Sequence, residues 1–311
     1  MTASFISEPK ISAGDAAART VRDFTRRNLS QLVLSPTVAS TLLVVYGFIL
    51  WTLYISFSKS RMTPDYSFAG FEEYVRLWSS PRWYTAVGNM LVFTSLYVVI
   101  CIAVGLLLAI LLDQHIRIEG ALRTIYLYPM AISFIVAGTA WKWILNPGIG
   151  IQKFMRDLGW SNFTFDWITD RNMAIYTLVI AAVWQASGFV MALFLAGLRG
   201  VDQEIVKAAH LDGAGAPRIY WSIIIPSLKP VFMSAIVILI HLSVKSFDLV
   251  VAMTAGGPGT ASDLPATFMF SMIFQKNQLG TGAASAMMML CVIVAVIVPY
   301  LYSELGGGKD G

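Results

Sequence analysis

Between two long apolar segments lies a polar island, Glu204-Ile-Val-Lys-Ala-Ala-His-Leu-Asp-Gly-Ala-Gly-Ala-Pro217, which continues to Ile223-Ile-Ile-Pro226. Asp202 stands just before it, and a carboxylate there can accept hydrogen bonds from the unpaired backbone N–H groups of a helix start. Gly213 can adopt a positive φ and end that helix, and Pro217 suits the first turn of the next one. The pattern predicts a stiff, bent helical hairpin.

The predicted hairpin carries small side chains where a partner protein could approach. Ala208 and Ala209 are adjacent, and Asp212-Gly213-Ala214 follows shortly after them. Small residues let a second protein come close to a helix backbone, which favours a docking surface over an active site. A plain connector between two apolar segments is the alternative interpretation of such a loop.

The composition indicates an integral membrane protein. The 311 residues are 57% hydrophobic and 13% charged, and the mean hydropathy is +0.67. Soluble domains are less apolar, with about 45–50% apolar and about 25% charged residues. The net charge of +4 is ordinary for a protein that faces anionic lipid, and no basic-aromatic cluster indicates nucleic-acid binding.

The apolar residues form long continuous runs, which predicts transmembrane helices rather than the alternating pattern of a β-barrel. A sixth apolar segment, Pro230 to about Thr254, contains Lys245 and Asp248. The chain is therefore predicted to be an all-α integral membrane protein with six transmembrane helices. The other five runs lack charged residues, and each can hold the roughly 20 residues of a spanning helix: Asn28 to Ser58, Trp83 to Leu112, Thr124 to Trp141, Asn172 to Leu198 and Asn277 to Ser303.

Three regions follow from this pattern. Residues 1–31 form an N-terminal arm, residues 32–303 hold the six helices and the polar loop 199–229, and residues 304–311 form a Gly-rich tail that is expected to be flexible. Positive charge favours the cytoplasmic side of a membrane. With six spans, both termini and the loop 199–229 are then predicted to be cytoplasmic. This orientation depends mostly on the arm, which carries Lys10, Arg19, Arg22, Arg26 and Arg27.

Motifs for catalysis are missing from the sequence. No GxxxxGK[ST] phosphate loop occurs, because Gly308-Lys309 is followed by Asp310, so the chain is not expected to hydrolyse ATP. HExxH, GxSxG and paired metal-ligand spacings are missing as well, and there are three histidines, so no metal site is expected. Cys101 and Cys291 lie in apolar runs, where buried, inert thiols are expected. The predicted role is conformational rather than enzymatic.

Polar and aromatic residues inside the apolar segments mark a candidate substrate pathway. His241, Lys245 and Asp248 are spaced by four and three residues, which places them on one face of a continuous helix. Charges at that depth are costly unless they are paired or hydrated, so this face is predicted to line the bundle interior or a water-filled cavity. Lys245 and Asp248 could instead simply neutralise each other. Planar polar and aromatic groups that suit sugars extend the candidates to Trp184, Gln185 and Phe247.

Short motifs along the chain resemble one family. Ala208-Ala-His-Leu-Asp-Gly-Ala214 with Ile223-Ile-Ile-Pro226 resembles the EAA loop of permease subunits in binding-protein-dependent ABC importers, especially the carbohydrate class that includes the larger maltose permease subunit. Other segments between roughly Phe68 and Tyr300 look like the same family: Asn89-Met-Leu-Val-Phe-Thr94, Arg123 with Pro129, Trp141 through Gly150, Trp184-Gln185, Ala196-Gly-Leu198, Ala255-Gly-Gly-Pro258 and Gly282-Ala-Ala284.

The resemblance implies a type I ABC importer transmembrane domain in a bacterial inner membrane. It implies a second permease subunit of different sequence, a dimer of ATPase subunits that bind ATP and Mg, and an extracytoplasmic sugar-binding protein, with no cofactor in this chain. The implied cargo is a mono- or oligosaccharide, of glucose or mannose type. The family motif opens with a glutamate where this chain has Lys207, and Glu204 lies one turn earlier. The implied ATPase-coupling residues are Glu204, Lys207, Ala208, Ala209, Asp212, Gly213 and Ala214.

Two other functional classes compete with an ATP-driven importer. The stronger is an ion-gradient-driven secondary carrier in which Lys245 and Asp248 form the coupling pair. Inverted repeats or spans broken by Gly and Pro in matched halves would favour that class, and the sequence shows neither. An intramembrane enzyme ranks third, because no catalytic constellation is present.

Overall fold

The computed structural model describes residues 31, 33–114 and 117–307, with side chains up to residue 302. Within these ranges the chain is helical, and the β-type pairing is an isolated antiparallel bridge between Ser58 and Phe68. The chain forms two compact units, residues 1–54 and 55–311. The two units are described separately.

The described part of the first unit belongs to one apolar helix. A candidate span covers Val33–Ser56 and crosses into the second unit at its end. It contains a π-helical turn, η1 (Leu42–Tyr46), followed by α2 (Gly47–Ser56). Most side chains of this span are exposed, Leu43 by 76%, as expected for a helix that faces lipid or another subunit. The predicted N-terminal arm lies outside the described residues except for its last position.

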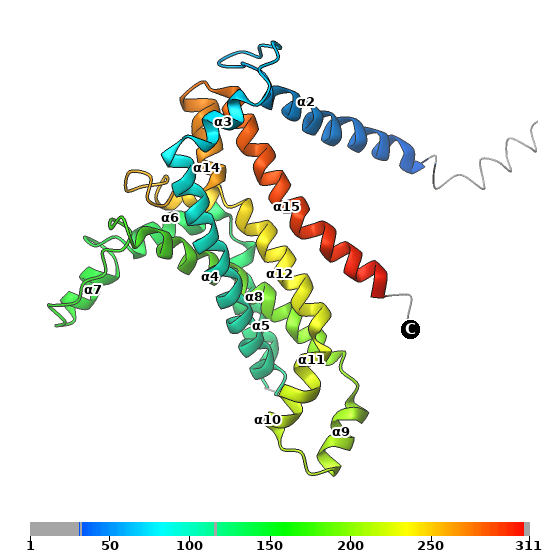
Figure 1. Cartoon of the computed structure of the whole chain (residues 1–311). Helices are drawn as coiled ribbons and strands as arrows, with labels where there is room; N and C mark the ends of the chain where they lie inside the picture. Colours follow the sequence, from blue (N-terminus) through cyan, green and yellow to red (C-terminus); the bar gives the residue numbers. More distant parts are fainter. Residues whose placement is uncertain (1–30, 32, 115–116, 308–311) are drawn as a thin grey trace, which may run out of the picture. The chain divides into compact units, whose positions relative to one another are not determined.

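The spans of the second unit are long apolar helices, and two of them are bent (Figure 1). Three are continuous: α4 (Pro81–Leu112), α8 (Ala174–Arg199) and α15 (Leu279–Gly307). With Val33–Ser56 and the two bent helix pairs, the described residues contain up to six candidate spans. The predicted number of six transmembrane helices agrees with the structure when each bent helix pair is counted as one span.

The third span is broken, which the sequence analysis did not predict. It consists of α5 (Glu119–Ala131) and α6 (Phe134–Ile144), which meet at an angle of 99°. Pro129 lies in the last turn of α5, where it removes one backbone donor, and Ile132 has an extended backbone at ψ 137°. The backbone groups at such a break need other partners inside a membrane.

The fifth span is also interrupted. α12 (Lys229–Val244) ends at the predicted pathway residues, and α13 (Asp248–Met253) begins after a gap of three residues. The prediction that His241, Lys245 and Asp248 share the face of one continuous helix is therefore wrong. Lys245 caps the C-terminal end of α12 and Asp248 opens α13.

Shorter helices lie in the connections and around the bends. α10, η2 and α11 lead into α12 across a bend of 62°. α15 continues to Gly307, so residues 304–307 of the predicted tail are helical and the tail residues 308–311 lie outside the described ones. The short helices are α3 (Glu72–Trp78), α7 (Ile151–Asp157), α9 (Gln203–Leu211), α10 (Ala216–Ile219), η2 (Tyr220–Ile224), α11 (Ile225–Ser227), α14 (Pro265–Phe270) and η3 (Ser271–Gln275).

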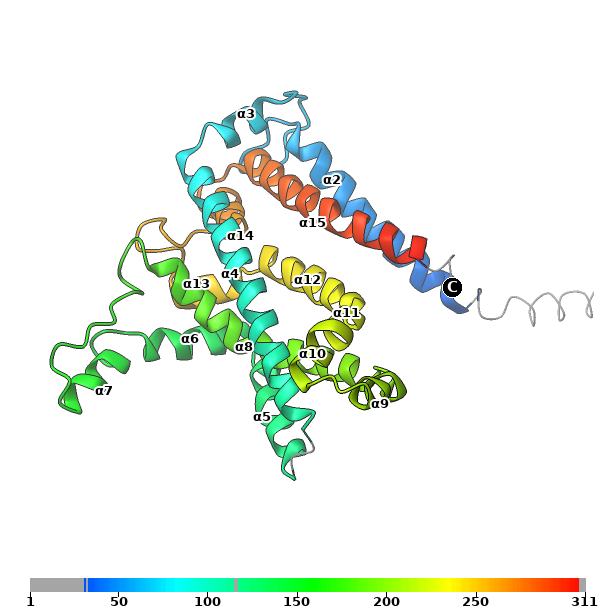
Figure 2. The same cartoon turned by 60° about the horizontal axis from the view of Figure 1, so that its bottom comes forward.

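The core of the second unit lies where α4 packs along α8, and both views show the two helices side by side (Figures 1 and 2). Glycines permit this close packing. A Cβ at Gly105 would lie 2.6 Å from a Val190 side-chain atom, and one at Gly188 would collide with the Tyr126 carbonyl of α5. α8 is thereby held between α4 and α5, with buried Phe194 among its core side chains.

Candidate functional site

The polar island folds as the predicted hairpin. The side chain of Asp202 accepts a hydrogen bond from the backbone N–H of Glu204 over 2.9 Å and caps α9. Gly213 follows the helix with φ +82°, and Pro217 lies in the first turn of α10. All three local predictions are confirmed. They hold because each depends on backbone chemistry within a few residues.

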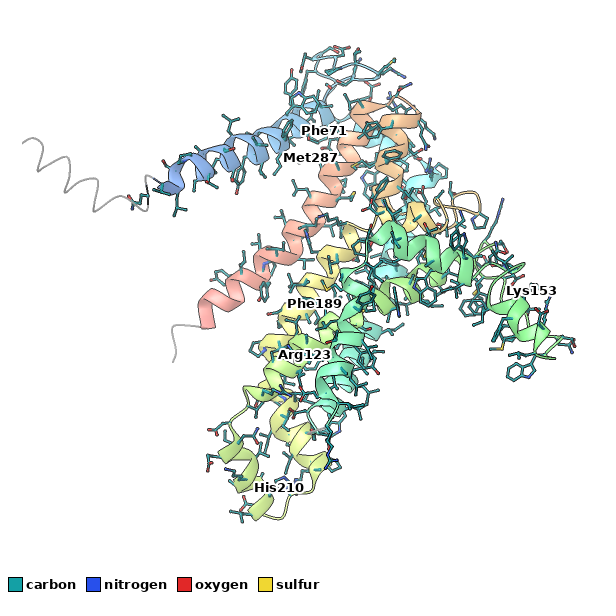
Figure 3. The ribbon with its side chains drawn as sticks, turned by 180° about the vertical axis from the view of Figure 1, so that it is seen from behind. Phe71, Arg123, Lys153, Phe189, His210 and Met287 are labelled. Carbon is teal, nitrogen blue, oxygen red and sulfur yellow. The ribbon has the colours of Figure 1, made fainter. Side chains whose placement is uncertain are left out.

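The hairpin is exposed. α9 contains no buried residue, and Leu211 at its end is exposed by 90% and Ile205 by 53%. α9 lies at the lower end of the second unit in Figure 1, and Figure 3 places His210 at the opposite end of this unit from Phe71. The outer side of α9 is therefore not covered by the rest of this chain.

Lys207 occupies the position at which the family motif has an acid. Its Nζ lies 2.9 Å from Oε1 of Glu204, one turn earlier, and both side chains are exposed. The pair lies on the outer surface of α9 and leaves Ala208 exposed and Ala209 half-buried. The charges of Lys207 and Glu204 therefore compensate each other locally.

The base of the hairpin is linked to two other helices. Nη2 of Arg199, the last residue of α8, lies 2.6 Å from Oε1 of Glu119 at the start of α5, and its Nε lies 3.8 Å from Oδ1 of Asp113 after α4. A cavity of about 170 Å³ lies beside this link, under α9, with Asp113, His210 and Tyr220 in its lining. Arg199 thus links the base of the hairpin to the end of α4 and the start of α5.

At the two helix breaks, the structure brings three of the predicted pathway residues together. A cavity of about 180 Å³ is lined by Phe134, Leu242, Lys245, Ser246, Phe247, Asp248 and Leu249. α6 packs against α13 there, since a Cβ at Gly138 would lie 2.7 Å from the Ala252 side chain. Charged, hydroxyl and aromatic groups thus converge where both spans lose their helical hydrogen bonding.

Lys245 and Asp248 do not neutralise each other in this arrangement. Among the described residues no ion pair joins them, and both side chains are exposed. Each instead lies at the helix end that its charge favours, the cation at the C-terminus of α12 and the anion at the N-terminus of α13. Since exposed charges at membrane depth are costly in lipid, this face must meet water or protein.

The other three candidates are not in the lining of this cavity. His241 is exposed in the last turn of α12. The Trp184 ring makes an edge-on contact with Trp141 at 5.8 Å. Gln185 is buried, and its Nε2 donates to the Ile132 carbonyl over 2.9 Å. Gln185 therefore supplies the break in the third span with a hydrogen-bond partner, and within the described residues its Oε1 has none.

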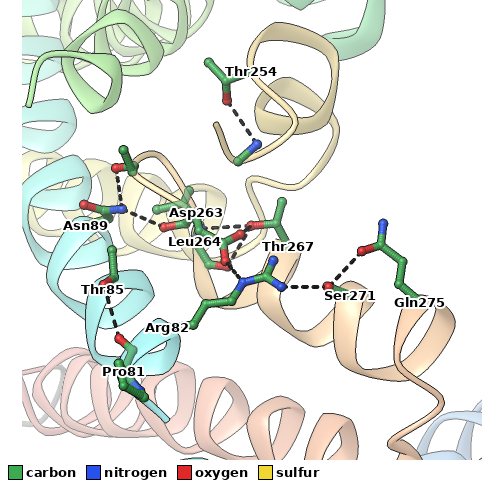
Figure 4. Close-up of polar contacts among 12 residues, drawn as sticks. Pro81, Arg82, Thr85, Asn89, Thr254, Asp263, Leu264, Thr267, Ser271 and Gln275 are labelled. Atoms are coloured by element: carbon green, nitrogen blue, oxygen red, sulfur yellow. Dashed lines mark hydrogen bonds and ion pairs between the residues drawn. The ribbon is translucent and has the colours of Figure 1, made fainter. Parts of the chain in front are cut away.

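A buried ionic cluster was missed by the sequence analysis. Nε of Arg82 in α4 lies 2.6 Å from Oδ2 of Asp263, which is 1% exposed, and its Nη1 donates to Ser271 (Figure 4). The Thr267 hydroxyl donates to the other Asp263 oxygen, and Asn89 donates to the Ala261 and Asp263 carbonyls. The cluster fixes the Gly-rich loop after α13 against α4. Of its members, the sequence motifs include Asn89, as the first residue of the segment 89–94, and neither Arg82 nor Asp263.

A second missed residue is Glu73 of α3, which is 3% exposed. Its carboxylate pairs with Arg76 at 2.7 Å and accepts a hydrogen bond from Thr281 in the first turn of α15. An acid beside a helix N-terminus is electrostatically favourable. Among the described residues no group of three or more His, Cys, Asp or Glu side chains could hold a metal ion.

Comparison with known proteins identifies the family. The profile of the binding-protein-dependent transport system inner membrane component matches residues 101–305. The probable ABC transporter permease protein PH1215 of Pyrococcus horikoshii is 38% identical over 278 residues, which cover 89% of this chain and 95% of the relative. The xylose/arabinose import permease protein XacH of Haloferax volcanii is 36% identical, covering 86% of this chain and 84% of the relative.

A solved structure shows the same fold. A chain of a bacterial ABC transporter involved in the import of the acidic polysaccharide alginate matches with a TM-score of 0.79 and 18% identity, covering 94% of this chain and all of that one. The fold is thus that of a type I ABC importer transmembrane domain. The chain belongs to the family of binding-protein-dependent transport system inner membrane components, multi-pass, non-catalytic permease subunits that work with an ATPase, a partner permease and a periplasmic binding protein.

Proposed function

We propose that this chain is a sugar permease whose hairpin α9–α10 docks on an ATPase subunit and transmits ATP-driven closure to the pathway. The observation that carries the proposal is the hairpin itself: a capped, exposed helix whose base is linked through Arg199 to α5 and α4. ATP and Mg bind to the partner ATPase. The docking surface comprises Glu204, Lys207, Ala208, Ala209, Asp212, Gly213 and Ala214.

The proposed cargo is a mono- or oligosaccharide, with glucose or mannose type sugars first among the candidates. The relative XacH is named a xylose/arabinose import permease. The cavity at the two helix breaks combines Phe134 and Phe247 with the Ser246 hydroxyl, Lys245 and Asp248. Aromatic faces next to hydrogen-bonding groups suit the alternating apolar and hydroxyl surfaces of a sugar.

The proposed orientation places the hairpin end and both termini in the cytoplasm. The support is the arginine-rich arm, because positive charge is retained on the cytoplasmic side. The opposite end, with α3 and the N-terminal end of α15, then faces the binding protein. The second permease is proposed to be a chain of different sequence that covers the exposed, charged face of α12 and α13.

Affinity purification from membranes in mild detergent, followed by reconstitution in vesicles, tests this function. We expect this chain to be recovered with an ATPase, a second six-helix chain and a binding protein. The vesicles are expected to take up sugar only when ATP is present on the side of the membrane that carries the ATPase. Uptake restricted to amino acids or metal ions would contradict the sugar assignment. Transport by this chain alone with an ion gradient would instead support the carrier with Lys245 and Asp248.

A further inference from the structure

An aromatic row extends from the proposed substrate cavity to α14 and η3, and α14 lies at the end of the second unit opposite the hairpin (Figure 1). Phe247, which lines the cavity, lies 5.0 Å from Phe270 between ring centroids, and Phe270 lies 4.9 Å from Phe274. The rings are tilted by 47° and 39°. Phe270 is exposed by 36% and Phe274 by 67%, so the row becomes more open with distance from the cavity.

Phe270 and Phe274 lie on the consecutive helices α14 and η3, and polar contacts of the residues next to these rings hold this segment in place. Arg82 donates to Ser271, and Ser271 donates to Gln275, each over 2.8 Å (Figure 4). These two residues directly follow Phe270 and Phe274 in the sequence. Ser271 and Gln275 thus form the side of this segment that faces the Arg82–Asp263 pair. Phe270 and Phe274 are four residues apart, so their rings project together from a different side of the segment.

The charges beside the row indicate that it does not border lipid. The cavity at its inner end contains Lys245 and Asp248, which are exposed and joined by no ion pair within the described residues. Two such charges face lipid only at high cost. Exposed aromatic rings that continue from a cavity with charged and hydroxyl groups, and that are held in place, are suited to stack against the apolar faces of a sugar.

We propose that Phe247, Phe270 and Phe274 form an aromatic track along which a sugar moves from the binding-protein side to the cavity at the helix breaks. The track deepens the proposed function and rests on it. It assigns Phe270 and Phe274, which lie on α14 and η3 and are not among the motif residues that carry the resemblance, to substrate contact. The ligand class is a pyranose or furanose unit that offers a face of C–H groups.

Cysteine accessibility in the reconstituted complex tests whether water reaches the track. In a Cys291→Ser background, Phe274→Cys is expected to react with a membrane-impermeant maleimide, and saturating sugar with its binding protein is expected to slow the reaction about threefold or more. The matched control is Val292→Cys, an exposed apolar position in the middle of α15, which is expected to stay unlabelled. Labelling of Phe274→Cys as poor as that of the control would overturn the proposal.

Ring chemistry is tested at Phe270 in the same complex. Phe270→Leu is expected to lower sugar uptake about three- to tenfold, and Phe270→Tyr, which keeps the ring, to retain it. Equal uptake by both variants and the unchanged complex would refute the track while leaving the sugar function in place. Loss of the assembled complex in both variants would assign the rings to a subunit interface and refute the track too. Absence of sugar uptake by the unchanged complex would instead refute the proposed function.

Discussion

Single residues determine the shape of the proposed docking hairpin. Gly213 is the clearest, because its φ of +82° is unfavourable for a residue with a Cβ, and its surroundings within 4 Å are open. Lys207 at the usual acidic position is compensated by Glu204 at 2.9 Å. An exposed pair of this kind contributes at most about 1 kcal/mol to stability, so its importance lies in the surface charge that it presents.

Gly213→Trp is expected to leave the protein folded and to uncouple ATP hydrolysis from transport. The open surroundings of Gly213 accept a large side chain, at a backbone cost of about 1–2 kcal/mol, but the indole would project from the surface that we assign to the ATPase. The measurement is ATP hydrolysed per sugar imported in vesicles. Gly159→Trp is the matched control, since Gly159 also has a positive φ, +102°, and open surroundings. Normal coupling in Gly213→Trp would remove the docking assignment.

Gln185 stabilises the break in the third span through one hydrogen bond. Gln185→Met keeps the volume and loses the donor to the Ile132 carbonyl in a partly buried hydrogen bond, and loss of such a bond costs about 1 kcal/mol. We expect a lower midpoint of thermal unfolding for the purified complex. Ser95→Ala serves as control, because the Ser95 hydroxyl bonds to a carbonyl of its own helix at an exposed position. Equal midpoints would show that the break needs no support from α8.

At the scale of helices, the sequence predicts the docking hairpin but not the breaks in the third and fifth spans. The hairpin was predicted because Asp202, Gly213 and Pro217 act on backbone groups within one turn. The break after Ala131 was not predicted, because a proline in a membrane helix is tolerated whenever neighbouring residues hydrogen-bond the backbone groups that it leaves unpaired. Here that neighbour is Gln185, which is 53 residues from Ile132 in the sequence. The interruption after Val244 was not predicted either, because no Gly or Pro lies next to it.

The loop after α13 is held to α4 by a pair of charges that are distant in sequence. Asp263→Ala would remove the carboxylate that pairs with Arg82, and breaking a buried ion pair costs up to about 3–5 kcal/mol. A marked loss of thermal stability is expected, with freer proteolysis of the segment 255–262. Lys153→Ala, which breaks an exposed pair with Asp157, is expected to change stability by less than about 0.5 kcal/mol. Similar effects of the two substitutions would show that the buried pair does not hold the loop.

At the scale of the whole subunit, the candidate site has two parts joined by α8. One end of α8 bears Arg199 at the hairpin base, and its middle bears Gln185 beside the break next to the cavity. The class of protein and most spans were predictable from apolar runs and motifs. The Arg82–Asp263 pair and the grouping of Phe134 with Lys245 were not, because they depend on which helices become neighbours after folding.

Arg199→Gln tests whether the two parts communicate through the hairpin base. The side chains of Arg199 and Glu119 are partly exposed, so their pair contributes no more than about 1 kcal/mol to stability, and the thermal midpoint is expected to change little. Sugar-stimulated ATP hydrolysis is expected to fall severalfold, because the hairpin would lose its link to α5. Exchange of the two charges, Arg199→Glu with Glu119→Arg, is expected to restore part of the stimulation, since Asp113 still repels the new acid. If the single substitution lowered stability and hydrolysis in parallel, or left both unchanged, Arg199 would have no separate role in coupling.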